Sequence, residues 1–94
     1  MKVYELLSNE SRWTRRAYAR DAQGNMCKAN DPDAQSWCII GGVYKCYTGI
    51  SLLDAEHRLL STLPAQNTYQ VAEWQDDPRV MFEMVRELLI AADV

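Results

Sequence analysis

The sequence lacks any long hydrophobic run. None of its apolar stretches approaches the roughly 20 residues that a membrane-spanning helix needs. The N-terminal segment contains the acidic Glu5 and has no apolar core of the kind found in signal peptides. We therefore expect a cytoplasmic protein with no membrane partner.

Residues suited to metal and redox chemistry are scarce, since the chain has three cysteines and one histidine, His57. Cys38 and Cys46 fall on one predicted helix, about 12 Å apart along its axis, which is too far for a disulfide. Cys27 could pair with either, but the spacing does not match the disulfide frameworks of secreted proteins. We expect reduced and buried thiols.

Two enzymatic or metal-binding alternatives stay open. Cys38 could act as a nucleophile with His57 as its base, and Glu73, Asp76 and Asp77 could act as acid–base groups or hold a hard metal ion. However, Cys38 lies in an apolar stretch, where thiols are normally inert, and acidic residues before a helix are typical caps. The sequence favours a protein without catalytic residues, metal or cofactor.

The sequence has no glycine-rich phosphate-binding loop. Two of its four glycines, Gly41 and Gly42, fall instead inside a helix predicted over residues 32–47, which the capping residues and proline of Asn30-Asp31-Pro32-Asp33 would begin. A glycine inside a helix costs about 1 kcal/mol relative to alanine. Two in succession predict that another part of the chain packs against this helix backbone.

What the sequence does contain is typical of one small folded domain covering residues 1–94. Its apolar fraction of 48% and charged fraction of 24% are ordinary for globular proteins. The patterns predict an α+β fold of three to four helices packed with one β-hairpin, at residues 2–7, 13–28 (the hairpin), 32–47, 51–62 and 78–92, with a short extended segment at 69–74.

Two further signals set the expected helix starts and the core. Ser51 would cap the helix at 51–62, and Asp76-Asp77-Pro78 would begin the last helix, whose apolar residues recur every three or four positions. The expected core consists of large apolar side chains, namely Trp13, Trp37, Cys38, Ile40, Leu59, Leu60, Met81, Val85 and Leu88.

Charge is divided unevenly along the chain. Residues 1–28 carry six basic and three acidic groups, and residues 29–94 carry four basic and ten acidic groups, which gives the overall charge of −3. In the hairpin, strand alternation would place Arg16, Tyr18 and Arg20 on one face, with Arg15 on the other. Two guanidinium groups around an aromatic ring suit an acidic protein face or a phosphate backbone.

We therefore expect the binding residues to be Arg15, Arg16, Tyr18 and Arg20. Replacing Arg16 and Arg20 together by Glu should abolish partner binding and leave thermal stability nearly unchanged. In the alternative interpretation, these charges only protect the edge of the sheet from pairing with other strands.

Four stretches resemble a group of small bacterial and phage domains, in which they read Trp-Thr, Ala-Arg-Asp-Ala-x-Gly, Ala-x-x-Trp-Cys-Leu-x-Gly-Ala and Ala-Trp-Asn-Asp. Here they are Trp13-Thr14, Ala19-Arg20-Asp21-Ala22-Gln23-Gly24, Ala34 with Trp37-Cys38-Ile39-Ile40-Gly41, and Ala72-Glu73-Trp74-Gln75-Asp76. Gly42 stands where the group has Ala, and the last stretch is looser than in the group. The resemblance implies a compact mixed fold and a bacterial or phage origin, and no activity.

The leading hypothesis is a non-catalytic protein that engages a protein or nucleoprotein partner, as a phage or bacterial accessory factor that could inhibit a host system. The alternative is the small enzyme or metal-binding protein described above. A third hypothesis is a homo-oligomer that buries the outer face of the last helix at Phe82.

Overall fold

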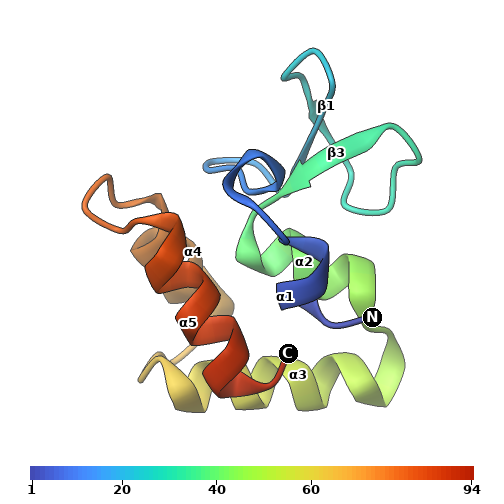
Figure 1. Cartoon of the computed structure of the whole chain (residues 1–94). Coiled ribbons are helices and arrows are strands. Elements are labelled where there is room, and N and C mark those ends of the chain that lie inside the picture. Colours follow the sequence, from blue (N-terminus) through green and yellow to red (C-terminus); the bar gives the residue numbers. More distant parts are fainter.

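Helices form one end of the molecule and a small sheet forms the other in the computed structural model, which describes all 94 residues (Figure 1). The elements are α1 (Val3–Leu6), the 3₁₀ helix η1 (Glu10–Arg12), β1 (Ala19–Asp21), β2 (Met26–Cys27), β3 (Ala34–Trp37), α2 (Ile39–Cys46), α3 (Gly49–Thr62), α4 (Thr68–Asp76) and α5 (Phe82–Ala92). The predicted α+β class is confirmed, with five α-helices and a third strand beyond the expected hairpin. None of the helices is long and apolar enough to span a membrane.

The sheet is antiparallel, with the strand order β2-β1-β3. The predicted turn between β1 and β2 is confirmed, since the Gly24 N–H donates to the Asp21 carbonyl at 3.0 Å. However, β1 begins at Ala19 and not at Trp13, because residues 15–18 form a bend in which Arg16 has a φ of 63°. The expected strand alternation over residues 13–20 is therefore wrong.

The helix predicted over residues 32–47 is a helix only in its second half. The Asp31 carboxylate accepts from Asp33 N at 2.8 Å, so the capping residues before Pro32 make a tight turn instead of starting a helix. Ala34 to Trp37 then pair with β1 as strand β3, and α2 begins only after Cys38. Pairing with β1 decides the conformation, because short capping signals are compatible with both a turn and a helix.

The segment expected to be extended at 69–74 is the helix α4. Its N-cap is Asn67, whose side chain accepts from Gln70 N at 3.0 Å, and its buried residues Val71 and Gln75 are one turn apart. Because one residue of the buried face is polar, the apolar residues of this segment do not repeat with the period of a helix. Because α4 extends to Asp76, the last helix begins at Phe82 and not at residue 78.

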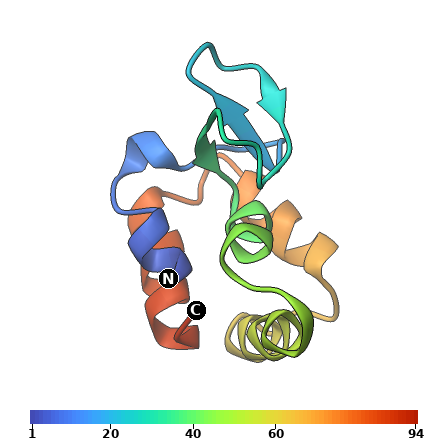
Figure 2. The ribbon, with the colours of Figure 1, turned by 90° about the vertical axis from the view of Figure 1, so that its right-hand side faces the viewer.

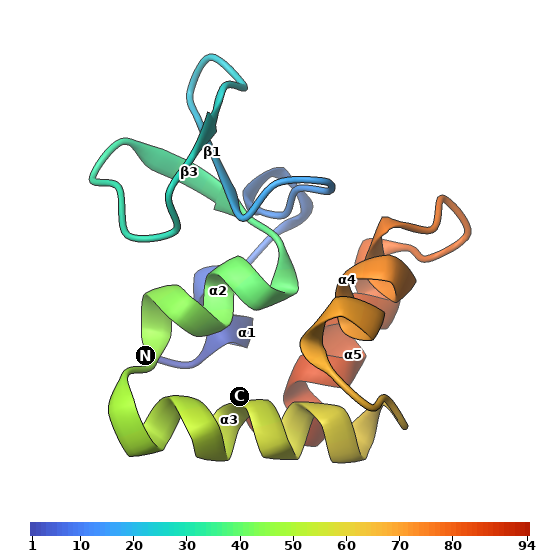
Figure 3. The same cartoon turned by 180° about the vertical axis from the view of Figure 1, so that it is seen from behind.

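The predictions of an N-terminal helix and of a helix near residues 51–62 are confirmed by α1 and α3. The cap of α3 is Thr48 rather than Ser51, and the Ser51 hydroxyl accepts from Thr48 N at 3.2 Å. Helix α3 lies across the base of the molecule, and α2 lies between it and the sheet (Figures 1 and 3).

One cluster of buried apolar side chains joins all the helices to the sheet. Seven of the nine predicted core residues are buried, and Leu60 is half-buried. Met81 is 55% exposed, because it precedes α5 as its N-cap and so stands outside the apolar stripe of that helix. The close packing expected at Gly41 and Gly42 is confirmed, since the Tyr18 backbone and the Val3 side chain lie against them.

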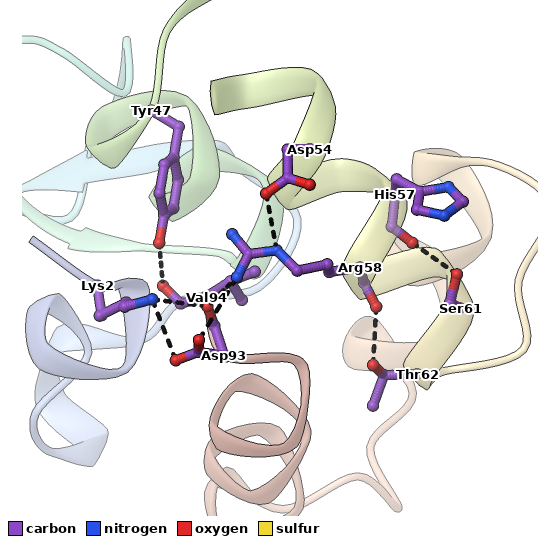
Figure 4. A network of polar contacts seen from close by, with 9 residues as sticks. All are labelled: Lys2, Tyr47, Asp54, His57, Arg58, Ser61, Thr62, Asp93 and Val94. Atoms are coloured by element: carbon purple, nitrogen blue, oxygen red, sulfur yellow. Dashed lines mark hydrogen bonds and ion pairs between the residues drawn. The ribbon is translucent and has the colours of Figure 1, made fainter. Parts of the chain in front are cut away.

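The two ends of the chain lie side by side, with α1 next to α5 (Figure 2). The Lys2 ammonium lies 3.0 Å from the Asp93 carboxylate, and Arg58 of α3 donates to the Asp93 carbonyl at 2.7 Å (Figure 4). The Tyr47 hydroxyl donates to the carbonyl of the buried Val94 at 2.8 Å. This network fastens both chain ends to the helical end of the molecule, far from the bend at residues 15–18.

Candidate binding groove

An open cavity of about 440 Å³ lies between the bend at residues 15–18, strand β2, the start of α2 and helix α4. Figure 3 shows how α2, α4 and the sheet are arranged. Arg16, Tyr18 and Met26 line the hairpin side, and Ala72 and Asp76 line the α4 side. We call this cavity the groove; its volume falls in the range of ligand pockets, and most of its lining side chains are hydrophobic.

Only two of the four predicted binding residues line the groove, Arg16 and Tyr18. Arg15 is held inside the fold instead. Its Nε donates to the Gln75 carbonyl at 3.2 Å, its Nη2 donates to the Val80 carbonyl, and its guanidinium lies 4.4 Å from the centre of the Trp13 ring. Arg15 therefore connects the bend to the end of α4.

Arg20 is also held by the fold. Its guanidinium donates to the Thr14 hydroxyl at 3.0 Å, to the Gly24 carbonyl at 3.0 Å and to the Arg15 carbonyl at 3.2 Å. These three bonds connect the bend, β1 and the hairpin turn. Of the predicted arginines, only Arg16 presents a guanidinium without an intramolecular hydrogen bond or ion pair.

The expectation that changing Arg16 and Arg20 together to Glu leaves stability nearly unchanged is therefore wrong. Arg20→Glu should lower the free energy of unfolding by about 2 kcal/mol, because it removes three bonds from a half-buried charged donor. Arg16→Glu should change it by less than about 0.5 kcal/mol, as expected for an exposed side chain without contacts. Urea denaturation of the two single variants measures the difference. Equal stability of the two variants would mean that the Arg20 bonds do not support the hairpin.

Asp76 fixes the conformation of Arg16. Asp76 Oδ1 accepts from the Arg16 backbone N–H at 3.1 Å and also from the side-chain amide of Gln75. At the other end of the bend, the Tyr18 carbonyl accepts from Cys38 N at 3.2 Å. The bend is thus held between α4 and α2, and it presents the Arg16 side chain at the surface.

The groove is bordered by exposed aromatic and thioether groups. Tyr18 is 57% exposed and Met26 is 70% exposed. The Tyr18 ring packs on Tyr44 of α2 with a centroid distance of 5.7 Å, which limits its motion. The hairpin thereby offers a largely pre-formed apolar surface next to the Arg16 charge.

The two cysteines that line the groove are protonated thiols at neutral pH. Burial raises the pKa of Cys38 above its ordinary value of 9.0, and loss of hydration raises that of Cys27. Cys38 Sγ accepts from Gly41 N at 3.2 Å and so serves as the N-cap of α2. His57 is exposed on α3 and does not line the groove beside Cys38. The geometry gives no support to a Cys38–His57 pair.

The three carboxylates of the metal-binding alternative are used separately. Asp76 holds the bend, Glu73 is exposed, and Asp77 forms an ion pair with Arg79 at 2.7 Å. No three His, Cys, Asp or Glu side chains of the chain are placed to hold a metal ion. The carboxylate cluster that the sequence suggested is therefore not formed.

The Asp77 carboxylate should titrate with a pKa of about 2, because the Arg79 side chain and backbone N–H both donate to it. Since this pKa is lowered from 3.8, the Asp77 contribution to stability is present above pH 4 and is lost as the pH falls toward 2. Carbon-detected NMR titration measures the pKa, and Arg79→Ala should move it part of the way back. An ordinary pKa in the parent protein would contradict this ion pair.

The homo-oligomer expected at Phe82 stays a prediction, but Phe82 itself is not an exposed residue. Phe82 is half-buried and packs against Trp13, with a ring-centroid distance of 6.0 Å. The side chain therefore belongs to the contact between α5 and the segment before the bend, and it is not available as the centre of an outer face.

Sequence reasoning missed Gln75, which lines the groove with only 1% of its surface exposed. Its side-chain oxygen accepts from Trp13 Nε1 at 2.8 Å and from Ile39 N at 3.2 Å. The available signal was its position one turn after Val71, which places a polar side chain on an apolar helix face.

One protein-family model matches the chain, over residues 2–93, and its description is a family of unknown function, DUF6197. The match spans nearly the whole chain and includes every residue that lines the groove. No curated protein and no solved structure matches the chain.

Proposed function

Because this chain belongs to the DUF6197 family, whose function is unknown, we propose a function from its surface. The domain is a non-catalytic binding protein that recognises a segment of a partner protein in the groove between the hairpin and α4. The observation that supports this proposal is the open cavity with Arg16, Tyr18 and Met26 on its hairpin side.

Arginine, tyrosine and methionine are enriched at protein–protein interfaces relative to the rest of protein surfaces. Tyr18 and Met26 expose most of their surface beside a cavity, whereas exposed apolar residues that stand alone are common and do not indicate a binding site. The support of Tyr18 by Tyr44 lowers the cost of ordering the surface when a partner binds.

A protein partner fits these charges better than a nucleic acid does. Affinity for nucleic acids rises with the number of phosphate contacts, but Arg15 and Arg20 are held by intramolecular bonds and the chain has a net charge of −3. The resemblance to bacterial and phage domains supports an accessory role in a bacterial cell, with inhibition of a host assembly as one mode.

Selection from a random dodecapeptide display library on the immobilised domain tests this proposal. We expect enriched peptides whose affinity falls about tenfold or more, equivalent to 1.4 kcal/mol, with Tyr18→Ser and with Met26→Ser. Ile50→Ser is the matched control, because Ile50 is 86% exposed on α3 and does not line the groove, so this change should leave binding unchanged.

Enriched peptides whose binding is indifferent to the Tyr18 and Met26 variants would contradict the proposal, as would the absence of any enriched peptide. Circular dichroism of each variant confirms that the fold is intact before binding is compared.

A further inference from the structure

The Arg16 guanidinium is the one positive group of the groove, and it forms no ion pair within the chain. The only carboxylate in the lining belongs to Asp76, and it forms no ion pair with Arg16. Its Oδ1 instead accepts from the Arg16 backbone and the Gln75 amide. The groove therefore holds a fixed turn that displays an unpaired cation.

The backbone conformation at Arg16 is unfavourable for an arginine. A φ of 63° lies in the left-handed region, which glycine, asparagine and aspartate tolerate best and which is unfavourable for a long side chain. The Arg16 side chain makes no hydrogen bond or ion pair that would compensate for this cost. The surrounding structure holds this conformation instead, through the Asp76 carboxylate, and strain held in this way is typical of binding and active sites.

Most of the residues that line the groove with Arg16 are apolar. Ala17, Tyr18 and Met26 lie on its side of the groove, and Ala72 lies on α4 opposite. A cavity of about 440 Å³ has room for a large apolar side chain together with a neighbouring polar one. Since a guanidinium binds carboxylates through two parallel hydrogen bonds, the complementary group is an acidic residue.

We infer that the groove recognises a peptide segment in which an aspartate or glutamate neighbours a large apolar residue. The carboxylate binds Arg16, and the apolar side chain packs against Tyr18 and Met26. Asp76 is a positioning residue, since it holds the turn that presents Arg16 and makes no ion pair with it. This inference rests on the proposed function and adds the chemistry of the partner.

Parallel library selections on the parent protein and on Arg16→Glu test the inference. Peptides selected by the parent should carry an acidic residue within about four positions of a large apolar one, and those selected by Arg16→Glu should carry a basic residue there. A selected peptide in which the acidic residue is changed to its amide should bind the parent about tenfold more weakly. The same change should have little effect on binding to Arg16→Gly.

Arg16→Gly also separates binding from folding, because glycine relieves the left-handed strain and the variant should be at least as stable as the parent. Peptides that depend on Tyr18 but show no acidic preference would overturn this inference and leave the proposed function standing. Peptides that ignore the groove altogether would overturn both.

A short single-stranded oligonucleotide tests whether the groove binds phosphate groups instead of a peptide. We expect no displacement of a selected peptide by the oligonucleotide. Displacement that requires Arg16 and weakens steeply with salt would overturn the inference in favour of phosphate recognition.

Discussion

Gly41→Ala is expected to lower the free energy of unfolding by about 3 kcal/mol, the upper part of the usual range for overpacking a core. A Cβ atom at Gly41 would lie 1.8 Å from the Tyr18 carbonyl oxygen and 2.7 Å from its carbonyl carbon. That carbonyl belongs to the backbone and accepts the Cys38 N–H, so it cannot move away without breaking the junction between the bend and α2. The clash outweighs the roughly 1 kcal/mol that alanine adds to helix propensity.

Gly42→Ala is the matched control in the same helix. A Cβ atom there would lie 2.7 Å from Val3 Cγ1, which belongs to a side chain that Val3→Ala removes, whereas the clash at Gly41 is with the backbone. In the background of Val3→Ala, adding Gly42→Ala should therefore be neutral or stabilising, whereas adding Gly41→Ala should remain costly. Urea denaturation followed by tryptophan fluorescence measures the two single glycine variants, the Val3→Ala background and the two double variants. A Gly41→Ala protein as stable as the parent would show that α2 does not pack against the bend.

Gln75→Leu should be comparably destabilising, by about 3 kcal/mol. It removes the acceptor of two buried donors, Trp13 Nε1 and Ile39 N, and an unsatisfied buried donor costs about 1 to 3 kcal/mol. It also removes the amide that donates to Asp76, so the bend should loosen and peptide binding in the groove should weaken.

Two comparisons isolate the cause of the Gln75 effect. Glu73→Leu changes an exposed residue of the same helix and should alter stability by less than about 0.5 kcal/mol. Trp13→Phe removes one of the two donors that Gln75→Leu leaves without an acceptor. The double variant should therefore lose about 1 kcal/mol less stability than the two single variants lose together. Additive single effects would mean that the Trp13–Gln75 bond contributes little.

These variants also define how the groove should be probed. Gly41 packs against the bend, and Gln75 donates to the Asp76 carboxylate that holds it, so changes at either residue affect folding as well as binding. Arg16, Tyr18 and Met26 are exposed, so changes at these positions report on binding.

The sequence by itself determined the elements whose signals are local and long enough. The apolar stripes of α3 and α5 repeat over several turns and identify both helices. The turn at Asp21–Gly24 is specified by its own residues, through the φ of 82° at Gly24 and the Asp21 carboxylate that accepts from Gln23 N. The paired glycines predicted a close approach, because their conformational cost needs a compensating contact.

Only the tertiary structure decided the rest. Residues 34–37 form a strand because β1 pairs with them, although the capping signals before them also fit a helix. Arg15 and Arg20 resemble Arg16 in sequence. Arg20 differs from Arg16 because the hairpin turn and the bend place nearby acceptors such as the Gly24 carbonyl against it, and Arg15 differs because the fold brings the Gln75 carbonyl to it. A partner 60 positions away in the chain leaves no periodic signal. The groove and its single unpaired guanidinium therefore emerge only when α4 packs against the bend.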